Sequence, residues 1–238
     1  MHMVDFITEG PIATWNLGPL HLALTKPMVV STGVMIVLSL GFIWLGMRPK
    51  VIPETRRQIL AETIYGFVKN IVDENMGASY RAFIPFIGAL ILYLIGQNLA
   101  GLFGLKPATS SFSTTLGLGI VSFAIIHGYA IRSAGLGGYL RSYVKPMPFL
   151  LPITLLERII FPISLALRLF GNILAATVIM SLIYGALLHF VKLSALVLPL
   201  PFHAYFDIFD GGIQAVIFTF LTMIQIKLID QESRGEEE

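Results

Sequence analysis

The stretch IIFPISLALRLFGNILAATVIMSLIYGALLHFV, residues 159–191, decides the kind of fold that this chain can adopt. It is longer than the about 20 apolar residues that one helical membrane crossing needs. Its only formally charged side chain is Arg168. Because an arginine stays protonated in proteins, placing one inside a membrane is unfavourable. The stretch therefore predicts a membrane-crossing helix and marks Arg168 as a functional residue.

The composition of the whole chain agrees with a membrane protein. Of its 238 residues, 55% are hydrophobic and 13% are charged, and the mean hydropathy is +0.80. Soluble domains carry about 25% charged residues. The chain has no cysteine, which excludes disulfides, thiolate metal sites and a cysteine nucleophile. Because the first residues lack the basic and apolar regions of a signal peptide, we expect the mature chain to begin near Met1.

Long, nearly uncharged stretches predict an all-α integral membrane protein with five membrane-spanning helices. They cover residues 28–47, 83–105, 112–131, 159–191 and 193–226. Each of the first three is about one bilayer thick as a helix. The last two exceed thirty residues each, so they must tilt steeply, bend or lie partly across the membrane plane.

The segments between the crossings complete the predicted organisation. They are an external N-terminal segment (1–27), an inner loop (48–82), a second inner loop (132–158) and an acidic tail (229–238). In the first inner loop, residues 54–75 place apolar side chains on one helical face: Leu60, Ile64, Phe67, Val68 and Ile71. We predict an amphipathic helix on the membrane surface; an ordinary helix of a loop domain is the alternative.

The distribution of Lys and Arg predicts the orientation. With the N-terminus outside, the inner segments hold twelve of these residues, whereas the outer ones hold Lys26, Lys106 and Lys192. Because cytoplasmic loops carry the excess of basic residues, we expect the C-terminus, with Glu236–Glu238, in the cytoplasm. No internal repeat supports an inverted-repeat transporter.

Three charged residues, Arg168, Asp207 and Asp210, fall inside the last two predicted crossings, and all others are placed at termini, loops or helix ends. Each costs about 2.5–3.5 kcal/mol at a helix centre, so pairing, water or a partner charge must offset it. At 100° per residue, polar residues form one stripe on each crossing. The first stripe contains Glu157, Ser164, Arg168 and Asn172, and the second contains His203, Asp207, Asp210, Gln214 and Gln225. Together they predict a hydrated path.

A buried Arg–Asp ion pair that pins two helices together is an alternative, but it accounts for only one carboxylate. Arg168 lies nine residues from Ile159 and farther from Val191, so a straight helix would not let it reach the membrane surface. No facing pair of histidines is indicated for haem, and we expect no cofactor.

Several motifs carry a resemblance to a known family. They are PISLALRLFGNILA (162–175) and GGIQAVIFTFL (211–221), with weaker matches in FIPFIGALILYLIGQNLAGL (83–102), TTLGLGIVSFAIIHGY (114–129) and LPITLLE (151–157). On these residues the chain resembles the a subunits of F-type ATP synthases, in order over 48–228, and resembles bacterial and chloroplast members about equally. The family's plan of five crossings, an interfacial helix and a long tilted hairpin (159–228) agrees with the hydropathy.

The resemblance implies a non-catalytic stator subunit of a rotary ion motor. Its implied partners are a ring of c subunits, the b subunits of the peripheral stalk and the remaining ATP synthase subunits, in the energy-coupling (bacterial plasma) membrane; no nucleic acid is expected. Ions would reach a ring carboxylate through an aqueous half-channel from outside and leave through a second one to the cytoplasm. Rotation of the ring would drive ATP synthesis.

The resemblance also implies residue roles. Arg168 takes the place of the essential arginine between the half-channels, where its permanent charge blocks proton relay and favours proton release from ring carboxylates. Asn172 and Gln214 take the polar positions of the inlet side. Glu157 matches the acidic residue of the outlet side, with Ser164 on the same helical face.

Two positions depart from the family pattern. Many members have an acidic residue nine places after the arginine, where this chain has Thr177, and an aspartate in the loop where it has Ser111. It has instead Asp207 and Asp210 on the last helix. Our hypothesis is that Asp207, assisted by His203 or Asp210, took over the proton-accepting role.

Other classes stay open at this stage. An independent channel or secondary transporter would use Arg168 to bind an anionic substrate, and a structural scaffold would pass no ions. The residues are compatible with protons or with sodium as the coupling ion, and protons are the expected ion.

Overall fold

The computed structural model describes residues 13–17, 20–47, 55–102, 105, 107–144, 147–190 and 198–235. Parts of the predicted N-terminal segment, first inner loop and hairpin turn, and Glu236–Glu238, lie outside these residues. The strands are β1 (Ala13–Leu17) and β2 (Leu20–Leu24). The helices are α2 (Lys26–Gly46), α3 (Arg56–Asn75), α4 (Ile84–Leu102), α5 (Phe112–Ser142), α6 (Leu151–Phe190), α7 (Pro199–His203) and α8 (Gly211–Arg234), with a π-helix (Ala204–Asp210) between α7 and α8.

The predicted all-α membrane protein with five crossings is confirmed. Within the described residues, five helical stretches are long and apolar enough to cross a membrane: Lys26–Gly46, Ala78–Gly101, Phe112–Ser142, Pro148–Leu187 and Pro199–Arg234. The N-terminal segment adds a small hairpin that the sequence analysis did not predict. In it β1 and β2 pair antiparallel, with Ala13 opposite Leu24 and Leu17 opposite Leu20.

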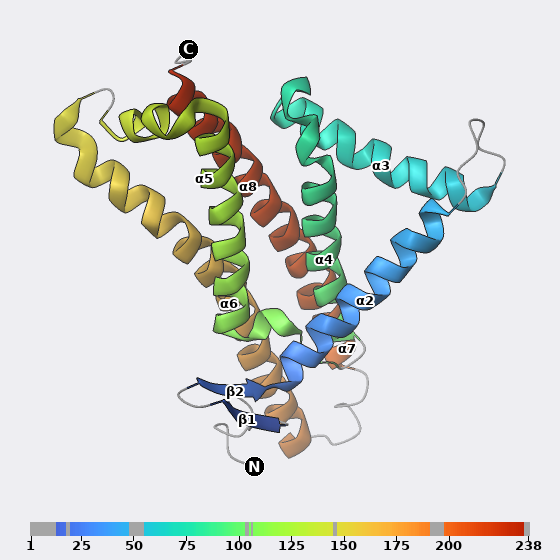
Figure 1. Ribbon diagram of the computed structural model, residues 1–238. Coiled ribbons are helices and arrows are strands. Elements are labelled where there is room, and N and C mark those ends of the chain that lie inside the picture. Colours follow the sequence, from blue (N-terminus) through green and yellow to red (C-terminus); the bar gives the residue numbers. More distant parts are fainter. Residues whose placement is uncertain are drawn as a thin grey trace.

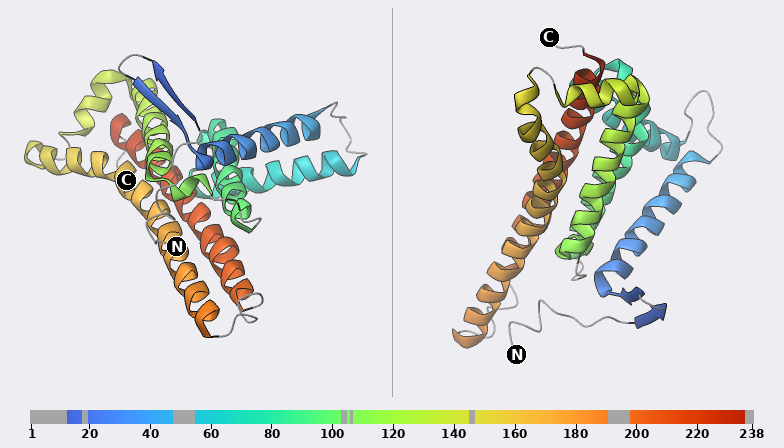
Figure 2. Two further views of the ribbon diagram at one scale, coloured as in Figure 1. Left: turned by 90° about the horizontal axis from the view of Figure 1, so that it is seen from below. Right: turned by 60° about the vertical axis from the view of Figure 1, so that its left-hand side comes forward.

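The helices form a bundle in which the first and last described segments lie at opposite ends (Figure 1). The strands lie at one end, and α8 leads to the C-terminus at the other. The long helices α6 and α8 extend away from the rest of the bundle, as the view from below shows (Figure 2). Helix α5 contacts both of them, and α4 contacts α2, α3 and α8. An odd number of crossings explains why these two segments lie at opposite ends.

The core has two apolar clusters at different heights of the bundle. One lies toward the C-terminal end and joins α3, α4, α5 and α8; it includes Val72, Ile87, Ile126 and Ile226, each at most 1% exposed. The other, which we call the middle layer, joins α4, α6 and α8 and consists of Leu90, Leu94, Leu165, Leu169, Ala215 and Phe218. The middle layer lies between the two polar regions described below.

The second inner loop is more helical than predicted. Helix α5 continues past Ile131 to Ser142, with a kink at Gly135, whose φ of 72° is one that glycine adopts readily. Helix α6 begins at Leu151, eight residues before the uncharged run. Periodicity and charge could not show this extension, because Glu157 and Arg158 interrupt the apolar run while remaining inside the helix.

Helix α3 agrees with the predicted helix over 54–75, but its apolar residues are divided between two environments. Val68 and Val72 are buried against the bundle, whereas Leu60 and Phe67 are 53% and 60% exposed. In Figure 1 the helix runs across the ends of α2 and α4 on the C-terminal side. A helix that packs on protein with one edge and exposes apolar residues on another is suited to a membrane surface, and its position there stays a prediction.

Gly119 sets how closely α5 approaches α6. A Cβ atom built there would lie 2.7 Å from the backbone oxygen of Pro162, whereas one at Gly117 would meet nothing within 4 Å. We expect Gly119→Ala to destabilise the chain by about 1–3 kcal/mol through overpacking. Gly117→Ala should leave stability unchanged or raise it, because alanine favours a helix. Thermal unfolding of the detergent-solubilised protein measures both; equal melting temperatures would show that this close approach is not needed.

Candidate ion-translocation site

Arg168 lies on the outer surface of α6. Its side chain is exposed, and it has no hydrogen bond or ion pair with any other described residue. The neighbouring Leu165 and Leu169, which face the bundle, are each 1% exposed and belong to the middle layer. The alternative of a buried pair between Arg168 and Asp207 or Asp210 is therefore not supported by the described residues. The guanidinium faces away from the bundle, where lipid or a partner subunit would lie.

Helix α6 is linked side chain to side chain, at three heights, to the last crossing, which runs from α7 to α8. The hydroxyl group of Tyr184 lies 3.2 Å from Nε2 of His203. The Nδ2 atom of Asn172 donates to Oε1 of Gln214 at 2.9 Å, and Nη2 of Arg158 donates to Oε2 of Glu232 at 2.8 Å. Residues that come later in α6 pair with residues that come earlier in the last crossing, so the two crossings run antiparallel.

Several polar residues lie along the first part of the last crossing, from the end of α7 through the π-helix to the start of α8. Gln214 is only 3% exposed, and its Nε2 atom is buried without a hydrogen bond to another described residue. His203 contacts Asp207 through Nδ1 and Oδ2 at 3.4 Å. The pair also faces α4, because a Cβ at Gly101 would lie 3.2 Å from Oδ1 of Asp207. These contacts bring together Asn172 with Gln214, and His203 with Asp207.

The π-helix explains why the predicted polar stripe on the last crossing is not continuous. Its i→i+5 hydrogen bonds widen the turn, so 100° per residue does not hold across Ala204–Asp210. Asp207 pairs with His203, whereas Asp210 makes no hydrogen bond or ion pair with another described residue. Such a segment inside an α-helix frequently marks a functional site.

The structure describes the other predicted site residues, but none of them forms a hydrogen bond with these pairs among the described residues. The Thr177 hydroxyl donates to the carbonyl of Ile173 at 2.8 Å, within its own helix. Ser164 is exposed on the same side of α6 as Arg168, and Ser111 precedes α5 at the end of the bundle away from the C-terminus.

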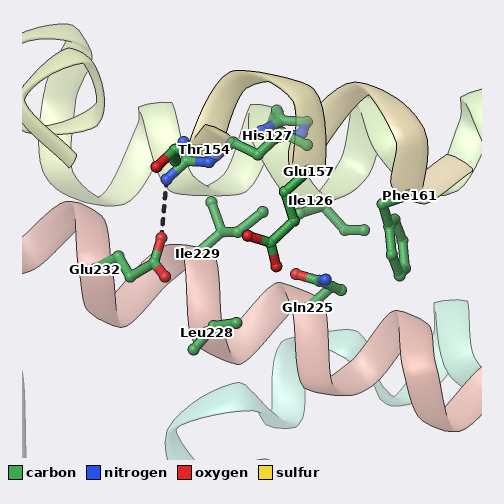
Figure 3. A pocket seen from close by; sticks show the side chains of 10 residues that line it. Ile126, His127, Thr154, Glu157, Phe161, Gln225, Leu228, Ile229 and Glu232 are labelled. Atoms are coloured by element: carbon green, nitrogen blue, oxygen red, sulfur yellow. Dashed lines mark hydrogen bonds and ion pairs between the residues drawn. The ribbon is translucent and has the colours of Figure 1, made fainter. Parts of the chain in front are cut away.

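Glu157 lies toward the C-terminal side, beside a cavity of about 30 Å³ between α5, α6 and α8 (Figure 3). Its carboxylate points across the cavity toward the Gln225 amide on α8. Thr154, His127, Arg158 and Glu232 also contribute to the wall. About 10–15 Å³ suffices for one water molecule, so the space can hold water.

The sequence analysis assigned Arg158 to the second inner loop, whereas the structure places it within a helix. The residue lies inside α6, is 5% exposed, and its guanidinium lies 4.0 Å from the ring centre of Tyr143. Sequence reasoning also missed Asp230, which is 0% exposed and accepts a hydrogen bond from the Tyr80 hydroxyl at 2.8 Å. Both charges lie near helix ends in the sequence, and only their contacts reveal that they are buried.

The arrangement consists of two polar regions separated by an apolar one. The Asn172–Gln214 and His203–Asp207 pairs lie on one side of the middle layer, and the Glu157 cavity lies on the other. Gln214 and Gln225 are eleven residues apart, which is about 16 Å along a helix. Ionisable groups inside membrane-crossing helices typically line ion pathways. Fold and site thus define a multi-pass membrane protein of the ion-translocating class.

Comparison with known proteins gives the family. The model of the ATP synthase A chain family matches residues 28–227. The chain is 32% identical to the sodium ion-specific ATP synthase subunit a of Propionigenium modestum, over 84% of this chain and 72% of that relative. It is 30% identical to ATP synthase subunit a of Moorella thermoacetica, over 91% and 94% of the two chains, and 33% identical to subunit a 2 of a Bradyrhizobium species, over 89% and 91%.

The chain belongs to the ATP synthase A chain family. It is a membrane-embedded subunit of an ATP synthase complex and takes part in ion translocation. The resemblance inferred from the Arg-Leu-Phe-Gly-Asn core is confirmed.

Proposed function

We propose that this chain is the non-catalytic stator of the rotary motor and provides two half-channels that Arg168 separates. The single observation that carries the proposal is the position of Arg168: exposed on α6, with no ion pair to a described residue, at the level of the middle layer. A permanent cation there faces outward toward a partner. The proposed partner is the c ring, whose carboxylates pass it in turn, and the b subunits hold the chain in place.

The two polar regions support the assignment of the half-channels. The region of Asn172, Gln214 and the His203–Asp207 pair is the inlet, and the Glu157 cavity belongs to the outlet. The outlet lies on the side of the C-terminus, which the distribution of basic residues places in the cytoplasm. Because the middle layer is dry, ions pass from one region to the other only on the ring.

We propose the proton as the coupling ion. The inlet contains a histidine within 3.4 Å of a carboxylate and within 3.2 Å of a tyrosine hydroxyl. Imidazole exchanges protons near neutral pH, whereas a hard cation such as sodium prefers oxygen ligands. One relative is named as sodium-specific, so the ion must be tested directly on this chain.

Passive ion flux through vesicles distinguishes a stator from an independent channel. Vesicles that contain the membrane sector without the soluble head should conduct protons under an imposed potential, and vesicles with this chain alone should not. A pH-sensitive dye measures the flux, and replacing sodium by choline should leave it unchanged. Equal flux from the chain alone would identify a stand-alone channel, and loss of flux without sodium would overturn the choice of ion.

A further inference from the structure

The wall of the cavity in Figure 3 includes a buried cation, Arg158, that the mechanism above does not use. Arg158 is 5% exposed, and its guanidinium lies 4.0 Å from the ring centre of Tyr143 and 5.5 Å from that of Tyr139. Its Nη2 atom donates to Oγ of Ser142 at 2.9 Å and to Oε2 of Glu232 at 2.8 Å. The tyrosine rings thus cover one face of the guanidinium, and the hydrogen bonds to Ser142 and Glu232 occupy one of its edges.

The remaining edge of the guanidinium has no protein partner among the described residues. Its Nη1 atom is buried there without a hydrogen bond, and Arg158 lines the cavity. Buried N–H groups are almost always satisfied by protein or by ordered water. The wall also offers the Glu157 carboxylate, the Gln225 amide and the Thr154 hydroxyl, enough polar groups to hold water in a space of about 30 Å³.

We propose that Arg158 is a positioning residue of the outlet pathway, where its remaining edge orients water in this cavity. The inference rests on the proposed function. A proton that leaves the ring binds the Glu157 carboxylate, passes to the cavity water and leaves Glu157 ionised again. Arg158 remains charged throughout, so it orients the water without accepting the proton.

Charged or titratable groups line the cavity from each of the three helices that surround it. Helix α6 contributes Glu157 and Arg158, and α8 contributes Glu232. Helix α5 contributes His127, whose Nδ1 atom lies 2.9 Å from the hydroxyl of Tyr139, the tyrosine that also contacts Arg158. Contacts therefore connect His127, through Tyr139 and Arg158, to the partly exposed Glu232 along one part of the wall.

Thiol labelling tests the cavity directly, because the chain has no cysteine of its own. Gln225→Cys and Phe218→Cys lie seven residues apart on α8, which is two turns on the same face. Phe218 is 0% exposed within the middle layer and is the dry control. In vesicles of the complete ATP synthase, a charged methanethiosulfonate added on the C-terminal side should modify Gln225→Cys and not Phe218→Cys. Equal protection of the two cysteines would overturn the proposal.

Two further readouts separate a pathway role from a structural one. Modification of Gln225→Cys should remove most of the passive proton flux of the membrane sector; unchanged flux would place the cavity off the pathway and overturn the proposal. In an Arg158→Gln background, the ratio of modification rates by cationic and anionic reagents should rise severalfold, because a positive charge in the same cavity wall has been removed. Arg158→Lys should keep the original ratio, and an unchanged ratio in Arg158→Gln would exclude the electrostatic role.

These experiments distinguish a failure of the proposal for the cavity from a failure of the proposed function. Flux through unmodified vesicles that contain the ring tests the stator. Labelling of Gln225→Cys tests the cavity whether or not the ring turns. A chain that conducts with its ring but protects position 225 refutes only the cavity.

Discussion

Replacing Arg168 by Gln is expected to reduce ion-driven ATP synthesis in membrane vesicles about a thousandfold, to background. A unit charge pair about 4 Å apart at an effective dielectric constant of about 20 interacts by about 4 kcal/mol, and 1.4 kcal/mol corresponds to a factor of ten. Arg168 is exposed and carries no ion pair with a described residue, so its whole charge is available to a ring carboxylate. ATP formed after an imposed proton gradient measures the effect.

The Arg168→Lys variant tests whether any positive charge suffices at this position or whether the charge must be permanent. A lysine retains the charge in water but can lose its proton in an apolar environment, so it can relay protons that arginine blocks. We expect synthesis to fall strongly and a proton leak to appear. Proton pumping driven by ATP hydrolysis acidifies the vesicles, and the leak is measured as a faster loss of this acidification once pumping stops. Synthesis at the wild-type rate in the Arg168→Lys variant would contradict this account of why arginine occupies the position.

Arg81→Gln is the matched control for a lost surface cation. Arg81 lies 2.7 Å from Asp73 in an exposed pair, far along the chain from the hairpin. The hydrogen bond from Arg81 lowers the pKa of the Asp73 carboxyl, but exposed pairs contribute little to stability. ATP synthesis should remain near the wild-type rate. A similar loss in both variants would trace the effect of Arg168 to general damage rather than to its site.

The sequence predicted the crossings well because membrane insertion depends on long apolar runs. Arg168 could be found for the same reason, since a charge inside such a run has no local compensation. Arg158 escaped notice because its compensation is entirely tertiary: two tyrosine rings at the end of α5, one of them just past its last residue, and a carboxylate of α8 contact it. Periodicity likewise assumed a uniform α-helix at Asp207 and Asp210, whereas both residues lie in a π-helix. The cavity beside Glu157 depends on three helices and has no local signal.

Replacing Asp207 by Asn is expected to lower proton-driven ATP synthesis about a hundredfold, the lower end of what a positioned proton-transfer group contributes. Asp207 lies beside His203 and against Gly101, in the region proposed as the inlet. Asp210→Asn is the matched control, because Asp210 lies three residues away without a hydrogen bond or ion pair to a described residue. We expect it to retain most of the activity. Wild-type synthesis by Asp207→Asn would show that the proton-accepting role has not moved to this residue.

A second substitution tests whether the carboxylate itself is what the inlet needs. The Asn172–Gln214 and Tyr184–His203 contacts fix the register of α6 against the last crossing. Thr177 lies between them on α6, so it is level with the π-helix that contains Asp207 and Asp210. Adding Thr177→Glu to Asp207→Asn should restore synthesis at least tenfold over the single variant, because the channel regains one proton acceptor at the same height. Thr177→Glu alone should not raise synthesis above the wild-type rate and serves as the control for a second carboxylate. If the double variant is no more active than Asp207→Asn, Asp207 acts through its contact with His203 and not as an exchangeable proton acceptor.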